Sequence, residues 1–299
     1  MHSKIASLRE KRVYVGTSSW KYGGWRDLVY RRPYKSEKEF NEKCLEEYAE
    51  HYTAVGVDHT YYAWPLPTTF NKYVEQTPAD FKFGLKVTEK VTIFKYPNLK
   101  RYGKDAGKNN ETFLSASAFR ENFLPPLEPL KHRLGPLMLE FSQFYPGSIA
   151  SGGEFVERLD KFFTELKDLE GYQFAIELRN ANWLKKPYFE MLAKHGVGHV
   201  FNSWTRMPSV PEQIELAKEY PLPVFVARML LQPGTKYEEA VEAFSPYDKL
   251  QEVHPPLREG AAALINRAID TGVPAYVFVN NRAEGCAPKT IEGILELVG

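Results

Sequence analysis

The amino-acid sequence predicts an α/β fold, a TIM (β/α)8 barrel with an insertion after the third strand, on three observations. The chain has 299 residues, a length that one closed barrel of this kind commonly has. About eight short apolar runs alternate with amphipathic stretches, as expected of βα units around a parallel sheet. One long polar segment follows the third run. We therefore expect a single TIM-barrel domain over residues 1–299.

The expected strands are short runs rich in β-branched and aromatic residues, and each has the composition of a strand buried on both faces. In chain order they are residues 13–17, 54–58, 82–87, 136–141, 173–178, 198–202, 224–229 and 274–279.

The expected helices lie between these runs and show apolar residues at three- and four-residue steps, which form one stripe facing the barrel. Ser151 with Glu154, and Ser36 with Glu39, have the spacing of a capping box and mark two helix starts. A third helix is expected to end before Gly272. The stripes are interpreted as core, namely Phe155, Leu159, Phe162, Phe163, Leu166 and Leu169 in the first helix and Phe40, Cys44, Tyr48 and Tyr52 in the second.

The polar segment after the third strand covers residues 95–110. It is rich in Lys, Asn, Gly and Tyr and has no apolar period, so it is predicted to be a loop insertion.

Composition excludes several classes of protein. The 39 basic and 38 acidic residues nearly cancel, so no overall field attracts nucleic acid or a membrane. Cys44 and Cys286 are far apart and form neither a disulfide framework nor a zinc motif. No apolar stretch approaches the roughly 20 residues that cross a bilayer. We expect a cytoplasmic protein without a membrane partner, and the sequence leaves its oligomeric state open.

Several segments in order together resemble the domain of unknown function 72 family, also called YecE-like, over roughly residues 13–297. The first are Val15-Gly16-Thr17-Ser18-Ser19-Trp20 with Trp25 and Tyr30, Val57-Asp58-His59-Thr60-Tyr61-Tyr62 with Pro65, and Phe81-Lys82-Phe83 leading to Lys86. The others are Leu134-Gly135-Pro136, Glu177-Leu178-Arg179 with Trp183, Arg228, and Asn280-Asn281 with Gly285-Cys286-Ala287-Pro288. The resemblance implies a TIM barrel whose activity is not established.

The chain departs from the pattern of that family at three places. Gly56 stands where the family usually has Glu, and Glu140 stands where Gln is usual. Met229-Leu230 replace the His-Gly that commonly follows the arginine. The resemblance therefore implies the fold more directly than it implies a set of site residues.

Residues that end the strands of such a barrel point into one basin at its C-terminal face, where barrel enzymes place their chemistry. Glu177 and Arg179 are two residues apart and are expected to share a face. Glu177 would be a base or an orienting carboxylate, and Glu140 on the preceding strand would be a second carboxylate. We predict Glu177, Arg179 and Glu140 as catalytic residues, although buried ion pairs at the rim are the alternative.

Positive side chains from three strands, Lys86, Arg179 and Arg228, are predicted to bind an anionic or sugar-like small molecule. The other predicted ligand-binding residues are Trp20, Tyr61, Asn280 and Asn281. The insertion adds Lys95, Lys100, Arg101, Lys104 and Lys108, which are either solvated or contact the phosphates of a nucleic acid.

No cofactor or metal is expected. The chain has no HxH pair, no GxSxG motif and no glycine-rich nucleotide loop. His199 falls within a strand and is interpreted as a hydrogen-bonded core residue. Two functions stay open: a hydrolase or lyase acting on an anionic or sugar-like molecule, and a non-catalytic protein that binds a phosphate-bearing ligand or nucleic acid.

Overall fold

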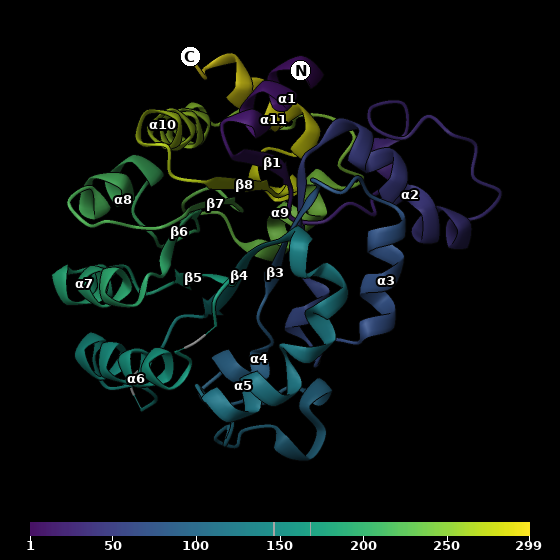
Figure 1. Ribbon diagram of the computed structural model, residues 1–299. Coiled ribbons are helices and arrows are strands. Elements are labelled where there is room, and N and C mark those ends of the chain that lie inside the picture. Colours follow the sequence, from purple (N-terminus) through teal and green to yellow (C-terminus); the bar gives the residue numbers. More distant parts are fainter. Residues whose placement is uncertain (146, 168) are drawn as a thin grey trace.

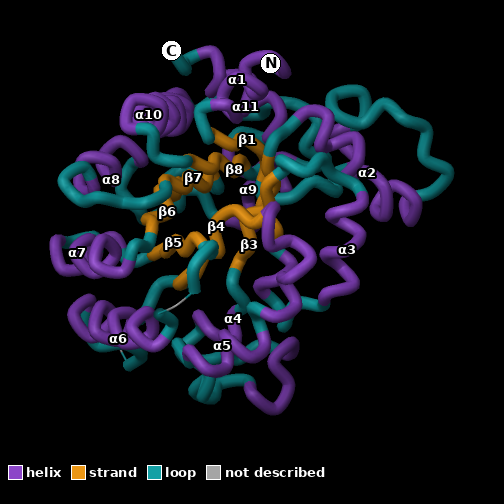
Figure 2. The backbone as a smooth tube through the Cα atoms, viewed as in Figure 1, coloured by secondary structure: helices purple, strands orange, loops and turns teal. Residues whose placement is uncertain are grey.

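Eight parallel strands close into a barrel in sequence order, β1 to β8, and β8 pairs with β1. The computed structural model describes residues 1–145, 147–167 and 169–299. Figure 2 shows the strands as a central ring with the helices outside it. The strands are β1 Val13–Thr17, β2 Ala54–Val57, β3 Lys82–Lys86, β4 Leu134–Phe141, β5 Gln173–Leu178, β6 Gly198–Ser203, β7 Phe225–Met229 and β8 Ala275–Val279. This architecture confirms the predicted TIM barrel.

The helices surround the barrel, and α1 and α11 lie next to each other beside β1 (Figure 1). They are α1 His2–Glu10, α2 Glu37–His51, α3 Pro67–Glu75, α4 Glu89–Thr92, α5 Ala116–Asn122, α6 Gly152–Glu165, α7 Lys186–His195, α8 Val210–Ala217, α9 Tyr237–Phe244, α10 Pro255–Thr271 and α11 Ala287–Glu296. Short 3-10 helices are η1 Gly23–Trp25, η2 His59–Tyr61, η3 Lys100–Asp105, η4 Pro125–Arg133, η5 Ala181–Trp183 and η6 Asn281–Ala283.

The predicted starts of α2 and α6 and the predicted end of α10 are confirmed, but α2 ends before Tyr52 and α6 ends before Leu166 and Leu169, which were predicted to be helical. The Ser36 side chain accepts a hydrogen bond from the Glu39 backbone at the start of α2, and Ser151 accepts one from Glu154 at the start of α6. Gly272 ends α10 with φ of 66°, a left-handed conformation that glycine adopts without the Cβ clash of other residues. Local sequence therefore sets where these helices begin and end.

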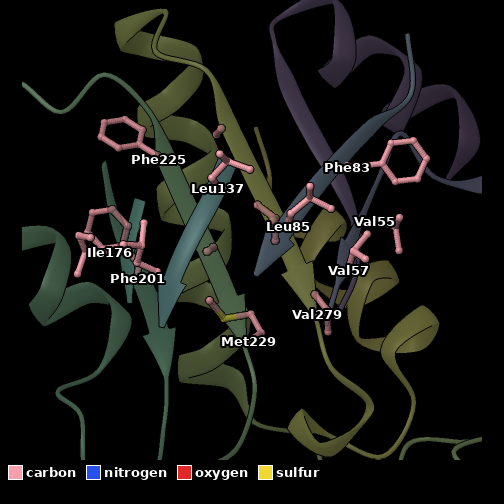
Figure 3. Close-up of a cluster of buried hydrophobic side chains, with 14 of the residues drawn as sticks. Val55, Val57, Phe83, Leu85, Leu137, Ile176, Phe201, Phe225, Met229 and Val279 are labelled. Atoms are coloured by element: carbon pink, nitrogen blue, oxygen red, sulfur yellow. The ribbon is translucent and has the colours of Figure 1, made fainter. Parts of the chain in front are cut away.

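Side chains alternate between the two faces of each strand. Those facing outward, such as Val55, Leu85, Leu137, Ile176 and Phe201, belong to the large hydrophobic core that packs under the helices (Figure 3). Those facing inward form a separate cluster that fills the barrel: Ala54, Met138, Ala175, Val200, Val224, Val226, Tyr276 and Phe278. The interior is thus solid, and functional groups are restricted to its two ends.

Gly84 on β3 makes room for this filling. A Cβ placed on Gly84 would lie 2.5 Å from Cζ of the Phe278 ring, well inside van der Waals contact. Glycine at this position therefore allows the aromatic ring to occupy the barrel centre.

The segment between β3 and β4 is the insertion, and it contains α4, η3, α5 and η4. Residues 95–110 are largely irregular, as predicted, but include the 3-10 helix η3. Gly103 interrupts that helix with φ of 50°. In Figure 1 the insertion, with its helices α4 and α5, lies beside β3 at the edge of the barrel.

Candidate functional site

A layer of polar residues covers the apolar interior at the C-terminal ends of the strands. These residues are two positions beyond inward-facing interior residues, so the same alternation directs them toward the barrel axis. They are Ser18, Asp58, Lys86, Glu140, Glu177, Asn202, Arg228 and Asn280. All except Asp58 are buried. The barrel mouth is therefore polar and enclosed.

Glu140, the inward residue near the end of β4, contacts three cations. Its Oε2 lies 2.7 Å from Lys86 Nζ, 3.0 Å from Arg179 Nη2 and 2.9 Å from Arg228 Nη1. Burial alone would raise the pKa of Glu140, but Arg179, Lys86 and Arg228 together hold that pKa below its ordinary value. Glu140 is therefore an ionised carboxylate at neutral pH.

Glu177 on β5 contacts two arginines, Arg179 with one side-chain oxygen and Arg228 with the other. Its Oε1 accepts hydrogen bonds from Arg179 Nε at 3.1 Å and Nη2 at 2.9 Å. Its Oε2 accepts a hydrogen bond from Arg228 Nη1. Burial acts to lower the pKa of Arg228, but Glu177, Asp58 and Glu140 raise that pKa above its usual value. Glu177 is fully buried, so its contacts orient the guanidinium groups.

Asp58 completes the network and is its most accessible member. Its Oδ1 accepts a hydrogen bond from Arg228 Nη2 at 3.2 Å and lies 3.9 Å from Lys86 Nζ. The Asp58 side chain is 34% exposed, against 13% for Arg179 and 10% for Lys86. We define the charge network as Asp58, Lys86, Glu140, Glu177, Arg179 and Arg228, with three carboxylates and three cations. Its formal charges cancel.

Two aromatic rings lie against the cations of this network. Lys86 Nζ is 4.3 Å from the centre of the Tyr61 ring, and Arg179 Cζ is 3.8 Å from the centre of the Trp204 ring. Both distances are within the range of cation–π attraction. Tyr61 is thus brought to the predicted site, and Trp204 fixes the plane of the Arg179 guanidinium.

Two buried polar atoms in the same layer have no hydrogen-bond partner among the described residues: Ser18 Oγ and Asn202 Oδ1. The Asn202 amide nitrogen contacts the carbonyl oxygens of Leu178 and Val200, each at 3.4 Å, so only weak bonds hold the amide. Buried polar atoms are usually satisfied, and exceptions point to a bound water or ligand. These two atoms therefore mark places where a ligand would contribute hydrogen bonds.

A cavity of about 720 Å³ lies between the insertion and the loop that follows β4, and none of the six charge-network residues lines it. It begins at Ser142, two residues beyond Glu140, and its aromatic walls include Phe94, Tyr96 and Phe144. Its volume is within the range of small-molecule sites, which are commonly lined by aromatic side chains. The insertion therefore forms one wall of a cavity at the C-terminal face.

Three predicted ligand-binding residues also make contacts within the protein. Trp20 packs edge-on against Tyr73 at 5.2 Å between ring centres. Asn280 caps η6 by accepting a hydrogen bond from the Arg282 backbone. Asn281 Oδ1 accepts hydrogen bonds from Trp25 Nε1 at 3.2 Å and from the Ala287 backbone at 2.8 Å. Their predicted ligand contacts stay predictions, while these contacts already explain the residue types.

Asp58 is the network residue that the sequence prediction missed. The second strand was predicted over residues 54–58, but Asp58, its last residue, was not among the predicted site residues. In the structure β2 ends at Val57, and the exposed His59 begins η2. The signal that identifies Asp58 is its position two residues after the inward-facing Gly56, parallel to the position of Lys86 after Gly84.

His199 is a core residue, as predicted. One ring nitrogen lies 3.0 Å from the Tyr188 hydroxyl, and the other lies 3.3 Å from Gln213 Oε1. Burial lowers the pKa of His199 to about 4, so the ring is neutral at physiological pH.

Adding EDTA should leave the melting temperature unchanged, because the described residues contain no group of three or more His, Cys, Asp or Glu side chains arranged to hold a metal ion. The oxygens of Glu177 already accept hydrogen bonds from arginines. Differential scanning fluorimetry with and without the chelator measures this, and EDTA loaded with calcium is the control. A clear drop with free EDTA alone would show a bound metal.

Glu140 should make stability depend on pH below about 4.3, the usual glutamate value. Its folded pKa is lowered, so its stabilisation is fully present above the unfolded pKa and is lost as pH falls through the folded pKa. Urea unfolding measures this pH dependence. The native protein and Glu140→Gln are compared at pH 7 and at a series of lower pH values. We expect Glu140→Gln to have a lower free energy of unfolding than the native protein at pH 7 and to lose less of it as the pH falls. If the free energies of both proteins fell in parallel with pH, Glu140 would not be the group responsible.

Comparisons with known proteins agree with this fold. The family model described as "Protein of unknown function DUF72" matches residues 14–299. The chain is 24% identical over 178 residues to the UPF0759 protein YunF of Bacillus subtilis, covering 60% of this chain and 54% of that protein. It is 24% identical over 192 residues to the UPF0759 protein YecE of Escherichia coli K12, covering 62% and 55%. The chain thus spans about half the length of these curated relatives.

Solved structures show the same architecture. A DUF72 family protein from Enterococcus faecalis V583 has a TM-score of 0.62 at 17% identity, over 96% of this chain and 95% of that one. One from Thermotoga maritima MSB8 has a TM-score of 0.58 at 20% identity, over 95% and 97%. At these identities the likeness concerns the fold. Among the described residues, no helix is long and apolar enough to cross a membrane.

Proposed function

Because this chain belongs to the DUF72 family of proteins of unknown function, its activity has to be inferred from the site, and we propose a hydrolase or lyase acting on a sugar-like small molecule. The reaction would take place at the C-terminal face, beside the charge network. The observation that carries the proposal is the balanced set of six charges at the barrel mouth, of which Asp58 is the most open to solvent.

Stability alone does not account for this network. Moving charges out of water costs free energy, and apolar side chains of similar size often stabilise a protein as well as a buried ion pair does. Apolar side chains fill the barrel interior below this network. Concentrating charges at the C-terminal face of a barrel is typical of an active site.

The charge balance favours a neutral polyhydroxylated ligand over an anion. Lys86, Arg179 and Arg228 each contact a carboxylate at 3.0 Å or less, so an anion would have to displace a carboxylate to bind them. Sugar hydroxyls both donate and accept hydrogen bonds and suit a surface that presents both kinds of group. The cavity between the insertion and the loop after β4 has aromatic walls that would contact the apolar faces of a ring.

The exposures suggest a role for each charged residue. Asp58 would accept a proton from water or from a substrate hydroxyl, because its carboxylate is the most accessible. Lys86, 3.9 Å away, would donate a proton to the leaving oxygen. Glu177 would orient Arg179 and Arg228, because its oxygens are enclosed and already accept hydrogen bonds.

A thermal-shift screen tests the ligand class, comparing neutral mono- and oligosaccharides with sugar phosphates and carboxylates. A ligand at a hundred times its dissociation constant should stabilise the fold by about 2.7 kcal/mol. Neutral sugars are the expected hits. A screen in which only anions stabilise the protein, and in which that effect is lost with Arg228→Ala, would favour the anion-binding alternative.

Turnover of each hit then tests the assigned roles. Asp58→Asn should keep binding but lose at least about a hundredfold in rate, the typical contribution of a positioned base. Asp270→Asn, which changes an exposed aspartate on α10, is the matched control and should react like the parent. Equal rates for Asp58→Asn and the parent would exclude Asp58 as the base.

The alternative of a nucleic-acid-binding protein depends on the insertion, and we predict weak polynucleotide binding. Its lysines, Lys95, Lys100, Lys104 and Lys108, are exposed, but Arg101 contacts Glu89 at 2.9 Å. Filter binding at several salt concentrations, with all five basic residues changed to Gln as the comparison, measures it. Tight, steeply salt-dependent binding that the substitutions abolish would instead support this alternative.

A further inference from the structure

A second cavity, lined largely by polar side chains, lies at the opposite, N-terminal end of the barrel. It has a volume of about 420 Å³, and its lining includes Arg12, Tyr14, Lys82, Lys131, Gln173 and Tyr276. Tyr14 and Tyr276 stack with their ring centres 5.0 Å apart, and the Tyr276 hydroxyl donates to Gln173 Oε1 at 3.2 Å. The apolar interior cluster separates this cavity from the charge network.

The charges around this cavity are not balanced. Three of the lining side chains are cations, and no described lining residue is acidic. Among the described residues, neither Arg12 nor Lys82 has a carboxylate within 4.0 Å, and Lys131 has a loose contact of 3.9 Å with Glu128. Arg12 and Lys82 instead donate to backbone carbonyls, of Gly272 and His132 respectively.

The two ends of the barrel differ in how their cations are paired. At the mouth every cation contacts a carboxylate, whereas at this end Arg12, Lys82 and Lys131 are left with spare positive charge around a cavity. Burial lowers the pKa of Lys82 more than the negative charge of Asp80 raises it. A bound anion would accept the remaining hydrogen bonds of these cations.

We propose that this cavity binds a small phosphate-bearing anion at the end of the barrel opposite the charge network. The volume exceeds what one phosphate group needs and accommodates an attached organic group of modest size. The cations would bind the phosphate oxygens. The partly buried Tyr172 and the stacked Tyr14 would contact the remainder of the ligand.

Isothermal titration calorimetry at low salt tests the proposal with three probes: inorganic phosphate, pyrophosphate and adenosine monophosphate. Preference for pyrophosphate would indicate that charge alone is recognised, and preference for the nucleotide would indicate that the aromatic wall also binds. Lys82→Met, Arg12→Gln and Lys131→Met should each weaken binding by at least about tenfold, the usual effect of losing one charge-assisted hydrogen bond. Lys38→Met, an exposed lysine on α2, is the matched control and should bind like the parent.

Stability separates a lost contact from a damaged fold. Lys131 is exposed, so Lys131→Met should keep the parent melting temperature in phosphate-free buffer while losing the stabilisation that the anion gives. The proposal is overturned if the parent binds none of the three probes at concentrations up to about 10 mM. It is equally overturned if the three variants bind like the parent, or if Lys38→Met weakens binding as much as they do.

Discussion

Replacing Glu177 with alanine is expected to lower the free energy of unfolding by about 3–5 kcal/mol, the usual effect of removing one partner from a buried charge pair. Glu177 is fully buried and accepts hydrogen bonds from Arg179 and Arg228. Its loss would leave two enclosed guanidinium groups with fewer carboxylates. Urea denaturation of both proteins at pH 7 measures the difference.

Glu165→Ala is the matched control for this experiment. Glu165 ends α6 and lies 3.8 Å from Lys161, and both side chains are largely exposed. An exposed pair of this kind contributes about 0–1 kcal/mol. Equal losses for Glu177→Ala and Glu165→Ala would mean that the charge network is far better solvated than its burial indicates.

Deleting residues 274–299 is expected to abolish cooperative folding. This segment contains β8, which pairs with β1 and with β7 along their whole lengths, and α11, whose Ile291 and Ile294 are buried. Without it the barrel is open, and two long strand edges and part of the apolar interior meet water. Circular dichroism and the thermal transition of the truncated chain, together with its solubility, measure the outcome.

Leu297→Ser is the control for the deletion, because the Leu297 side chain is 49% exposed and the change leaves β8 in place. It should unfold in a sharp transition close to that of the parent. A truncated chain that keeps an equally sharp transition would show that residues 1–273 fold independently, and the prediction of one barrel domain would be wrong.

Much of the fold is predictable from sequence because parallel strands are buried on both faces and appear as short apolar runs. The predicted strands agree with the observed ones to within two residues; the largest difference is at β4, which starts at Leu134 rather than at residue 136. The insertion was harder. A 3-10 helix has three residues per turn, so it lacks the apolar spacing of an α-helix. In η3 a glycine at a positive φ also interrupts the helix.

The composition of the site was partly predictable. Glu140, Glu177, Arg179, Arg228 and Lys86 gather because they end neighbouring strands of a closed ring. Their pairing was not predictable, because it depends on the stagger between strands and on side-chain reach across the barrel. Arg228 on β7, for example, contacts Glu140 on β4, which is not its neighbour in the sheet.

Asn280 and Asn281 show why capping residues are hard to recognise from sequence. Two amides directly after a strand resemble ligand-binding groups. However, a short 3-10 helix and then α11 follow them, and the first backbone N–H groups of both helices need hydrogen-bond acceptors. Asn280 satisfies the Arg282 backbone, and Asn281 satisfies that of Ala287. Because η6 has no recognisable sequence pattern, the sequence alone gives no reason to prefer capping over binding.

The solid apolar interior separates the two ends of the barrel. β3 is shared by both, since Lys82 lines the N-terminal cavity and Lys86 belongs to the charge network. Between them Gly84 lies against the Phe278 ring, so a shift of this strand at one end meets packed atoms at its middle. Any coupling between the two ends would require a change at β3 or in the packed interior. By thermodynamic reciprocity, an effector that tightened ligand binding at the mouth would itself be bound more tightly by the same factor.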